Sequence, residues 1–148
     1  MRLLLAGSPT KFFHLKEFGE ELKKQGHEYH LVKDIDYVNG FPNRKISKWF
    51  SSNKNFKKLL NEFKPDVIFV DRTKHFAMEA SKTDLPLIIH LRGDHWAELT
   101  MARETLYKSV GKKIALNKWE EIGEECFKGS TLILPICNHL SKITKERY

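Results

Sequence analysis

The sequence predicts an α/β fold, a Rossmann-like, doubly wound parallel sheet of about five strands with helices on both faces. Two apolar runs, 65–70 and 86–91, are continuous enough to be strands buried on both faces of such a sheet. Apolar runs alternate along the chain with segments in which apolar residues recur at helical spacing. The 148 residues are expected to form one domain, 1–148, with a substantial core.

The first half opens with a β-α-β unit. Residues 2–6 form the first strand, a helix with a periodic apolar stripe ends near Gly26, and residues 27–33 form a short second strand. Residues 34–42 are expected to be an irregular loop. A short helix capped by Asn43 and a second helix capped near Asn53 follow this loop.

The second half continues the alternation. The third strand, 65–71, and the fourth, 86–91, each start at a proline, and a short helix around 76–80 separates them. Apolar stripes predict helices at 99–110 and 115–126, divided by Gly111. A fifth strand covers 131–135, and a last helix begins at Asn138. Right-handed crossovers predict the strand order 3-2-1-4-5.

Charged side chains follow two of these strands where each strand ends. These residues are Asp71, Arg72 and His75 after the third strand, and Arg92, Asp94 and His95, together with Gly93, after the fourth. In the predicted order, the fourth strand ends across a crevice from the turn at Gly7 and Ser8, where open parallel sheets bind ligands. Carboxylate, imidazole and guanidinium groups together suit hydroxyl recognition and proton transfer. His90, inside the fourth strand, is expected to be a core histidine.

The composition excludes several classes of protein. No segment approaches the roughly 20 apolar residues that span a bilayer. Cys126 and Cys137 form neither a disulfide framework nor a metal-binding motif, so no metal is expected and the cytoplasm is the expected compartment. The turn after the first strand has one glycine where a dinucleotide fold has GxGxxG, so no nicotinamide or flavin cofactor is expected.

Most of the net charge of +7 lies between residues 44 and 64, a stretch that contains seven Lys or Arg residues and one Glu. The cations expected to form a membrane or anion surface are Arg44, Lys45, Lys48, Lys54, Lys57 and Lys58. Helical apolar spacing among these lysines is typical of an interfacial helix on an anionic membrane, and also of a core-packed helix with a solvated face. Nucleic-acid binding is not expected, because no helix-turn-helix, RNP, KH or zinc pattern is present.

In the order of its motifs, the chain resembles the N-terminal domain of GT-B-fold glycosyltransferases, in particular the retaining family 4, once called group 1. The motifs are the opening RLLLAGSP, the strand KPDVIFVDR, the strand and loop DLPLIIHLRGDHW, and the segment STLILPICNHLSKITKERY. That family has two Rossmann-like domains, with acceptor binding mainly in the first and the nucleotide-sugar in the second. The resemblance implies that this chain is the acceptor-binding half, without a cofactor of its own. It also implies a C-terminal donor-binding domain, in the same gene or on a separate chain.

The resemblance further implies roles for individual residues. Many relatives place a histidine followed by Asp or Gly at the end of the fourth strand, whereas Arg92 and Gly93 occupy that position here. Asp94 and His95 come directly after it and are the catalytic candidates. The residues expected to bind the acceptor, a glycan or a lipid-linked compound, are Gly7, Ser8, Asp71, Arg72, His75, Arg92 and Gly93. The basic stretch would correspond to the membrane-facing surface of members that glycosylate lipids.

Two other functions are compatible with the same residues. The chain could be a non-catalytic partner or regulatory subunit of Rossmann-like shape that docks a separate donor-domain protein. Its basic charge alone would also suit a nucleic-acid-binding domain, which predicts steep salt dependence without any effect of sugars.

Overall fold

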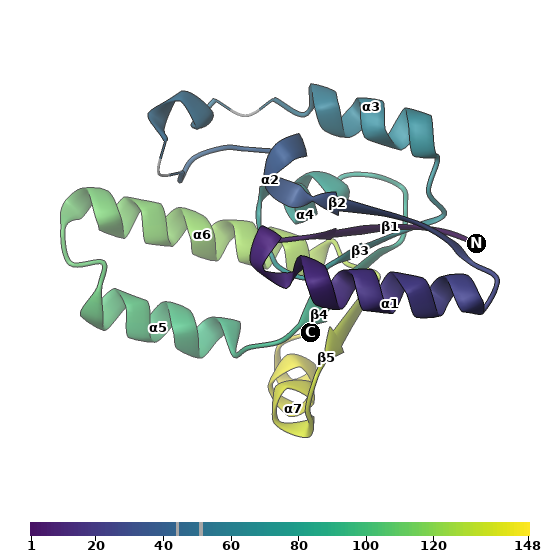
Figure 1. Ribbon diagram of the computed structural model, residues 1–148. Coiled ribbons are helices and arrows are strands. Elements are labelled where there is room, and N and C mark those ends of the chain that lie inside the picture. The colour runs from purple at the N-terminus through teal and green to yellow at the C-terminus, as the bar shows by residue number, and fades with distance from the viewer. Residues whose placement is uncertain (44, 51) are drawn as a thin grey trace.

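A computed structural model describes residues 1–43, 45–50 and 52–148 and confirms the α/β fold. Five parallel strands form one sheet with helices on both faces (Figure 1). The strands are β1 (Arg2–Gly7), β2 (Glu28–Lys33), β3 (Val67–Val70), β4 (Leu87–Leu91) and β5 (Leu132–Pro135).

The helices agree with the predicted alternation apart from three details. They are α1 (Phe12–Lys24), α2 (Asp34–Tyr37), α3 (Lys54–Phe63), α4 (His75–Ala80), α5 (His95–Thr105), α6 (Val110–Lys128) and α7 (Asn138–Arg147), with 3-10 turns η1 (Pro9–Lys11) and η2 (Ile46–Lys48). The predicted loop 34–42 begins with the single turn α2, and the helix expected after Asn43 is only the turn η2. Gly111 lies inside α6 and does not divide two helices.

The predicted strand order was wrong in one respect. The observed order is β2-β1-β3-β4-β5, so the third strand pairs with β1 and β2 is left at the edge. The reason is the polarity of β2, EYHLVK, in which Val32 alone is fully buried, whereas all four residues of β3 are buried. A polar strand suits an edge and an apolar one the centre. The point where the chain reverses direction across the sheet therefore lies between β1 and β3.

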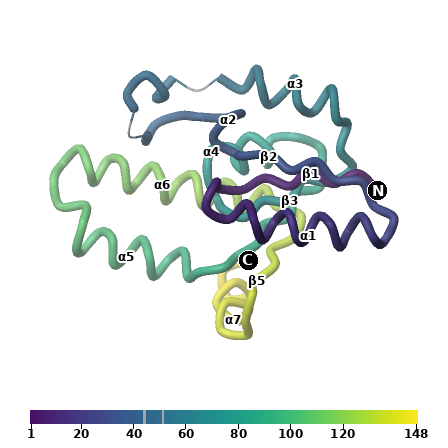
Figure 2. Tube along the Cα trace, viewed as in Figure 1, coloured from purple at the N-terminus to yellow at the C-terminus, as the bar shows by residue number. Residues whose placement is uncertain are grey.

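Alternate residues of the strands face two separate cores. Leu3, Leu5 and Phe69 pack with Leu15 of α1 on one face. The other face carries the larger core, to which α3, α4, α6 and α7 contribute apolar side chains. Figure 2 shows β5 and α7 at one end of the sheet, away from α3. On the face that α1 covers, Leu132 and Leu134 of β5 keep 47% and 39% of their surface exposed, so α1 leaves this end of the sheet open.

Candidate functional site

The turns after β1, β3 and β4 meet in one cleft of about 350 Å³ at the carboxyl edge of the sheet. Its lining includes Ser8 and Lys11 after β1, Asp71, Arg72, Thr73 and Lys74 after β3, and Arg92, Gly93, His95 and Glu98 after β4. This is where open parallel sheets place their ligands. Six of the nine residues predicted as catalytic or acceptor-binding line it: Ser8, Asp71, Arg72, Arg92, Gly93 and His95.

A buried carboxylate lies at the centre of the cleft. The side chain of Asp71 is only 2% exposed, its Oδ1 lies 3.1 Å from His90 Nδ1, and the same oxygen lies 3.6 Å from Arg92 Nη1. Because a carboxylate can only accept here, the imidazole N–H donates to it. Buried charges are stable only when they have such partners, so Asp71, His90 and Arg92 act as one unit, the Asp71 cluster.

His90 was interpreted from the sequence as a core histidine, but it is part of this cluster. The β3–β4 register pairs Val70 with Ile89, and one further step places Asp71 beside His90 on the same face. The side chain of His90 is 28% exposed and lines the cleft. The apolar runs alone could not identify His90, because the third and fourth strands are not neighbours in the predicted order 3-2-1-4-5, whereas β3 and β4 pair in the structure.

Beside the cleft, on the α1 face of the sheet, the Asp71 cluster also lines a smaller groove of about 300 Å³. His14 and Phe18 of α1 and Leu134 of β5 form its other walls. The cluster is therefore open to ligands from two directions.

Arg72 is held by a residue that sequence analysis did not select. Its guanidinium forms a two-pronged ion pair with Asp34, in which Nη2 donates to Oδ1 at 2.7 Å and Nε donates to Oδ2. Asp34 is 4% exposed and opens α2 directly after β2. The ion pair connects the end of β2 to the end of β3, so the main role of Arg72 is to stabilise the wall of the cleft.

Lys74 continues that wall and lies over an aromatic ring. Its ammonium nitrogen is 3.5 Å from the centre of the Trp119 ring on α6, a cation–π contact. Burial, followed by the nearby Arg72, lowers the pKa of Lys74 from 10.5 to about 8. Lys74 thus remains a cation at neutral pH, although its surroundings disfavour the charge.

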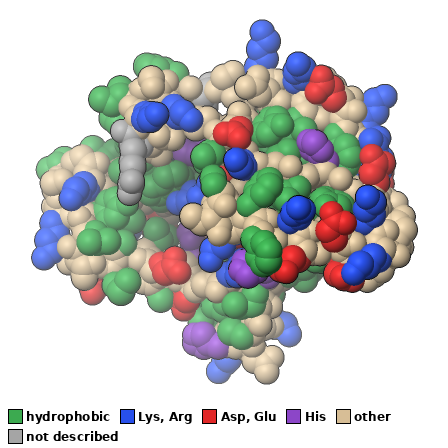
Figure 3. All heavy atoms as spheres, viewed as in Figure 1, with side chains coloured by type: hydrophobic (Ala, Val, Ile, Leu, Met, Phe, Trp, Pro, Cys, Tyr) green, Lys and Arg blue, Asp and Glu red, His purple; other side chains and the backbone are tan. Residues whose placement is uncertain are grey.

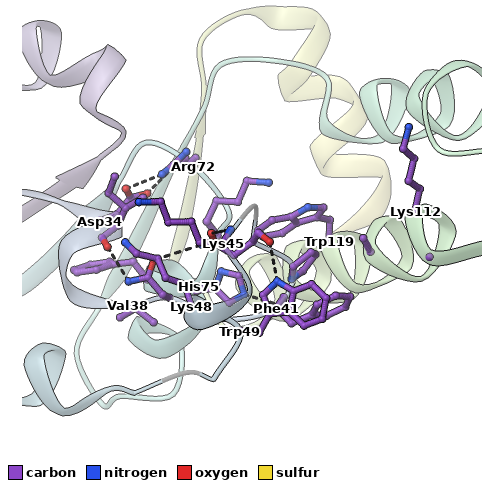
Figure 4. A pocket seen from close by; sticks show the side chains of 18 of the residues that line it. Asp34, Val38, Phe41, Lys45, Lys48, Trp49, Arg72, His75, Lys112 and Trp119 are labelled. Atoms are coloured by element: carbon purple, nitrogen blue, oxygen red, sulfur yellow. Dashed lines mark hydrogen bonds and ion pairs between the residues drawn. The ribbon is translucent and has the colours of Figure 1, made fainter.

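His75 points away from the cleft. Its Nε2 donates to the Phe41 carbonyl at 2.9 Å, and its ring meets Trp119 edge to face. Burial lowers the pKa of His75 below its usual 6.5. The structure therefore places His75 behind the wall that Arg72 and Lys74 form, in a second hollow lined by residues of 34–43, 45–49 and α6 (Figure 4).

The two catalytic candidates differ in position. His95 lines the cleft, with its ring edge-on to Phe127 and its Nε2 buried without a hydrogen-bond partner among the described residues. Burial, and then the charge of Lys74, lower the pKa of His95 below 6.5. Asp94 caps α5 instead, since its Oδ1 accepts from Ala97 N at 2.9 Å, and it lines a separate hollow. The structure does not bring Asp94 into the cleft.

Gly7, Ser8 and Gly93, at the ends of the strands, lie close to neighbouring side chains. A Cβ on Gly7 would lie 2.3 Å from a methyl carbon of Leu15, so a larger residue here would have to displace the Leu15 side chain. Ser8 is buried, and its hydroxyl lies 2.8 Å from the Thr10 hydroxyl. A Cβ on Gly93 would lie 2.5 Å from a carboxylate oxygen of Glu98, an acidic residue of the cleft that sequence analysis did not select.

The basic stretch divides into two parts. Lys45 and Lys48 line the second hollow, whereas Lys54, Lys57 and Lys58 are exposed on α3. Arg44 lies outside the described residues. Within the described ranges, no group of three His, Cys, Asp or Glu side chains could hold a metal ion. No helix in these ranges has the length and apolar character needed to cross a membrane.

Comparison with known proteins gives little. No protein-family model matches the chain, and no curated protein matches it. Among solved structures, a ribose-5-phosphate isomerase B from Clostridium thermocellum aligns over 99% of this chain and 95% of its own, with 16% identity and a TM-score of 0.32. A TM-score this low does not establish a shared fold, so the fold assignment rests on the strand order and register above.

Proposed function

We propose that this chain is the acceptor-binding half of a retaining, nucleotide-sugar-dependent glycosyltransferase. The observation that carries the proposal is the Asp71 cluster at the meeting point of three strand ends. A buried carboxylate that accepts hydrogen bonds, a guanidinium that donates them and an imidazole suit a sugar or other polyhydroxyl acceptor. The order of sequence motifs, which resembles the first domain of that family, supports the same function.

In this proposal the chain's residues have distinct tasks. Asp71 and Arg92 orient the acceptor hydroxyls, and Ser8 adds a hydroxyl at the β1 turn. His95 is the catalytic candidate that lines the cleft, and Asp94 is a positioning residue because it caps the helix that carries His95. A donor-binding domain, in the same gene or on a separate chain, would supply the nucleotide-sugar. We assign no metal or cofactor to this half.

The proposal is tested by titrating the labelled chain with methyl glycosides of glucose, mannose, galactose and N-acetylglucosamine in two-dimensional amide NMR. Saturable shifts are expected at the amides of Ser8, Asp71 and Gly93 for at least one glycoside. Asp71→Asn should abolish them, whereas Asp84→Asn, a matched change at an exposed turn, should not. No saturable shift up to roughly 50 mM, which corresponds to a binding free energy of about 2 kcal/mol, would overturn the site.

We also propose that the segment around η2 attaches the protein to an anionic membrane. Ile46, Trp49 and Phe50 are 67%, 41% and 86% exposed beside Lys45 and Lys48, which is the composition of an interfacial anchor. The test is co-sedimentation with vesicles of phosphatidylglycerol or of phosphatidylcholine.

The wild-type chain should sediment with the anionic vesicles, and Ile46→Ser with Phe50→Ser should release it. The control is Phe13→Ser, since Phe13 is 68% exposed on α1. Equal release by the control, or equal binding to both lipids, would contradict attachment through this segment.

A second candidate function is a partner subunit, and the open end of the sheet favours it. Leu132 and Leu134 of β5, the edge strand opposite β2, are 47% and 39% exposed, and Ile136 directly after β5 is 56% exposed. Exposed apolar edges of this kind mark interaction sites. If the glycoside titration fails, and Leu134→Lys abolishes co-purification with a donor-domain protein, the partner function is the better description.

A further inference from the structure

The second hollow is larger than the cleft and lies directly behind its wall. It measures about 960 Å³ and is lined by residues of 34–43 and 45–49, the start of α4 and the N-terminal half of α6. Arg72 and Lys74 line both spaces, so a ligand in one reaches the wall of the other. Figure 4 shows the side chain of Arg72 with those of the second hollow.

Cations dominate this hollow. Its charged lining residues are Lys45, Lys48, Arg72, Lys74, Lys112 and Asp34, and the carboxylate of Asp34 is occupied by Arg72. Among the described residues, none of the four lysines has a carboxylate within ion-pair distance. Figure 3 shows basic and histidine side chains gathered in the recess beside α6. The ammonium of Lys112 donates to the Leu106 carbonyl at 3.5 Å, which leaves Lys45, Lys48 and Lys74. Cations that line one space repel one another unless an anion lies between them.

Lys74 is the cation for which an anion matters most. It is only partly exposed, and its contact is the face of Trp119, at 3.5 Å. Burial already lowers the pKa of this ammonium to about 8. A bound anion would compensate the lost hydration directly, which a solvated surface lysine would not need.

The remaining walls are apolar and aromatic. Trp49 meets the Phe41 ring edge to face at 5.0 Å, and the Trp49 indole N–H donates to the Asn43 carbonyl at 2.7 Å, which fixes its ring. Trp119 is held between Lys74 and His75. A site with unpaired cations and fixed indole rings suits an anion that carries an apolar group, more than a bare inorganic ion.

We propose that the second hollow binds a phosphate or diphosphate ester of an apolar group, with the phosphoryl oxygens on Lys74, Lys45 and Lys48 and the apolar group against Trp49 and Trp119. A phosphomonoester carries close to two negative charges at neutral pH, which matches the unpaired lysines. Because the wall is shared with the cleft, this ester is assigned as the phosphorylated end of the acceptor, an assignment that rests on the proposed function. The binding of the ester itself does not rest on it.

The probe is phenyl phosphate, and the three tryptophans report where it binds. Trp49 and Trp119 line the hollow, whereas Trp96 lies in a different hollow with Asp94 and serves as an internal reference. In NMR titrations, phenyl phosphate should shift the indole N–H signals of Trp49 and Trp119 and leave that of Trp96 unchanged. Inorganic phosphate should bind at least about tenfold more weakly, because it lacks the apolar group. Neutral phenyl glucoside should not shift the two indoles.

Paired variants separate a built site from diffuse attraction. Lys45→Gln with Lys48→Gln should weaken phenyl phosphate at least about tenfold, since a hydrogen bond to a charged group contributes about 1.5–3 kcal/mol. Lys57→Gln with Lys58→Gln changes the net charge equally on the exposed face of α3 and should change binding less than about twofold. Lys74→Gln, with its fold checked by circular dichroism, should reduce binding at least as much as the first pair.

Three outcomes would overturn the proposal: an equal shift at Trp96, equal weakening by both lysine pairs, or inorganic phosphate that binds as tightly as phenyl phosphate. The result also stays separate from the glycoside titration. Phenyl phosphate bound at the tryptophans without any glycoside in the cleft would retain the phosphate site and refute the acceptor cleft. Glycosides bound in the cleft, without phenyl phosphate at the tryptophans, would do the reverse.

Discussion

Replacing Lys74 by Met should stabilise the protein at neutral pH. Burial lowers the pKa of the ammonium from 10.5 to about 8, so keeping it charged at pH 7 costs the folded state up to about 3 kcal/mol, at 1.36 kcal/mol for each unit. Met keeps an unbranched apolar stem but loses the cation–π contact with Trp119, which contributes about 1 kcal/mol. The expected net gain is about 1–2 kcal/mol.

The gain should depend on pH with a definite sign. Between the folded pKa of about 8 and the unfolded value of 10.5, the unfolded chain binds more protons, so wild-type stability rises with pH and the cost of Lys74 falls below about 1 kcal/mol at pH 10. Urea unfolding followed by circular dichroism at pH 7 and pH 10 measures this. The midpoint of Lys74→Met should exceed that of wild type by about 0.5–1 M at pH 7, for a slope of about 2 kcal/mol/M, and by less at pH 10.

The control is Lys57→Met, which removes an exposed charge on α3 and should change stability by less than about 0.5 kcal/mol. A Lys74→Met variant that is less stable than wild type at pH 7 would refute the reasoning. So would a gain of equal size at both pH values, because the effect would then not come from the charge.

Three further predictions concern residues that shape the cleft and the second hollow. Asp34→Asn should destabilise the fold by about 1–3 kcal/mol in urea unfolding, because it removes the carboxylate from a largely buried pair, and Arg72→Gln in the same background should cost little more. Gly123→Ala should lower the free energy of unfolding by about 1–3 kcal/mol, since the new Cβ would lie 2.3 Å from His95 Nε2. The control is Gly111→Ala in the same helix, which has nothing within 4 Å of the new Cβ and should raise the free energy of unfolding by about 0.5–1 kcal/mol. Equal effects of the two substitutions would contradict the close contact. Burial lowers the pKa of His95 below 6.5, so stability should fall as the pH drops below 6.5, where the unfolded chain takes up the proton, and His95→Gln should make this fall shallower; an unchanged slope would show that His95 is not the group responsible.

The sequence was sufficient to predict the strands, but not which strands lie next to one another in the sheet. Apolar runs such as 67–70 and 87–91 specify buried strands on their own, and both lie where they were predicted. The strand order depends on which strand tolerates an edge position. The polar residues of 28–33, EYHLVK, are the sequence feature that favours an edge for this strand. The turn η2, where apolar spacing predicted a helix, was not predictable, because Ile46 and Phe50 face solvent.

The candidate site divides in the same way. Residues that directly follow an apolar run were predictable, because the strand fixes where they emerge, as Asp71 and Arg92 show. The partners of those residues were not, since they depend on register and on the edge position of β2. His90 meets Asp71 through the β3–β4 register, and Asp34 meets Arg72 because β2 ends beside the same edge of the sheet. Asp94 was selected for its carboxylate and for its place after the position that resembles the family's strand-end histidine, and it caps a helix instead.

The edge position of β2 also explains why the second hollow exists. Among the described residues, no strand pairs beyond β2, and the chain after Lys33 turns back over the carboxyl edge as α2 and residues 38–43 (Figure 1). The Asp34–Arg72 pair fixes that return, and it leaves a space between the returning segment and α6. Lys45 and Lys48, further along the chain, line this space together with Lys74. The edge position of β2, which the predicted order 3-2-1-4-5 did not contain, therefore goes together with the returning segment that lines the second hollow, where we propose that the phosphorylated ligand binds.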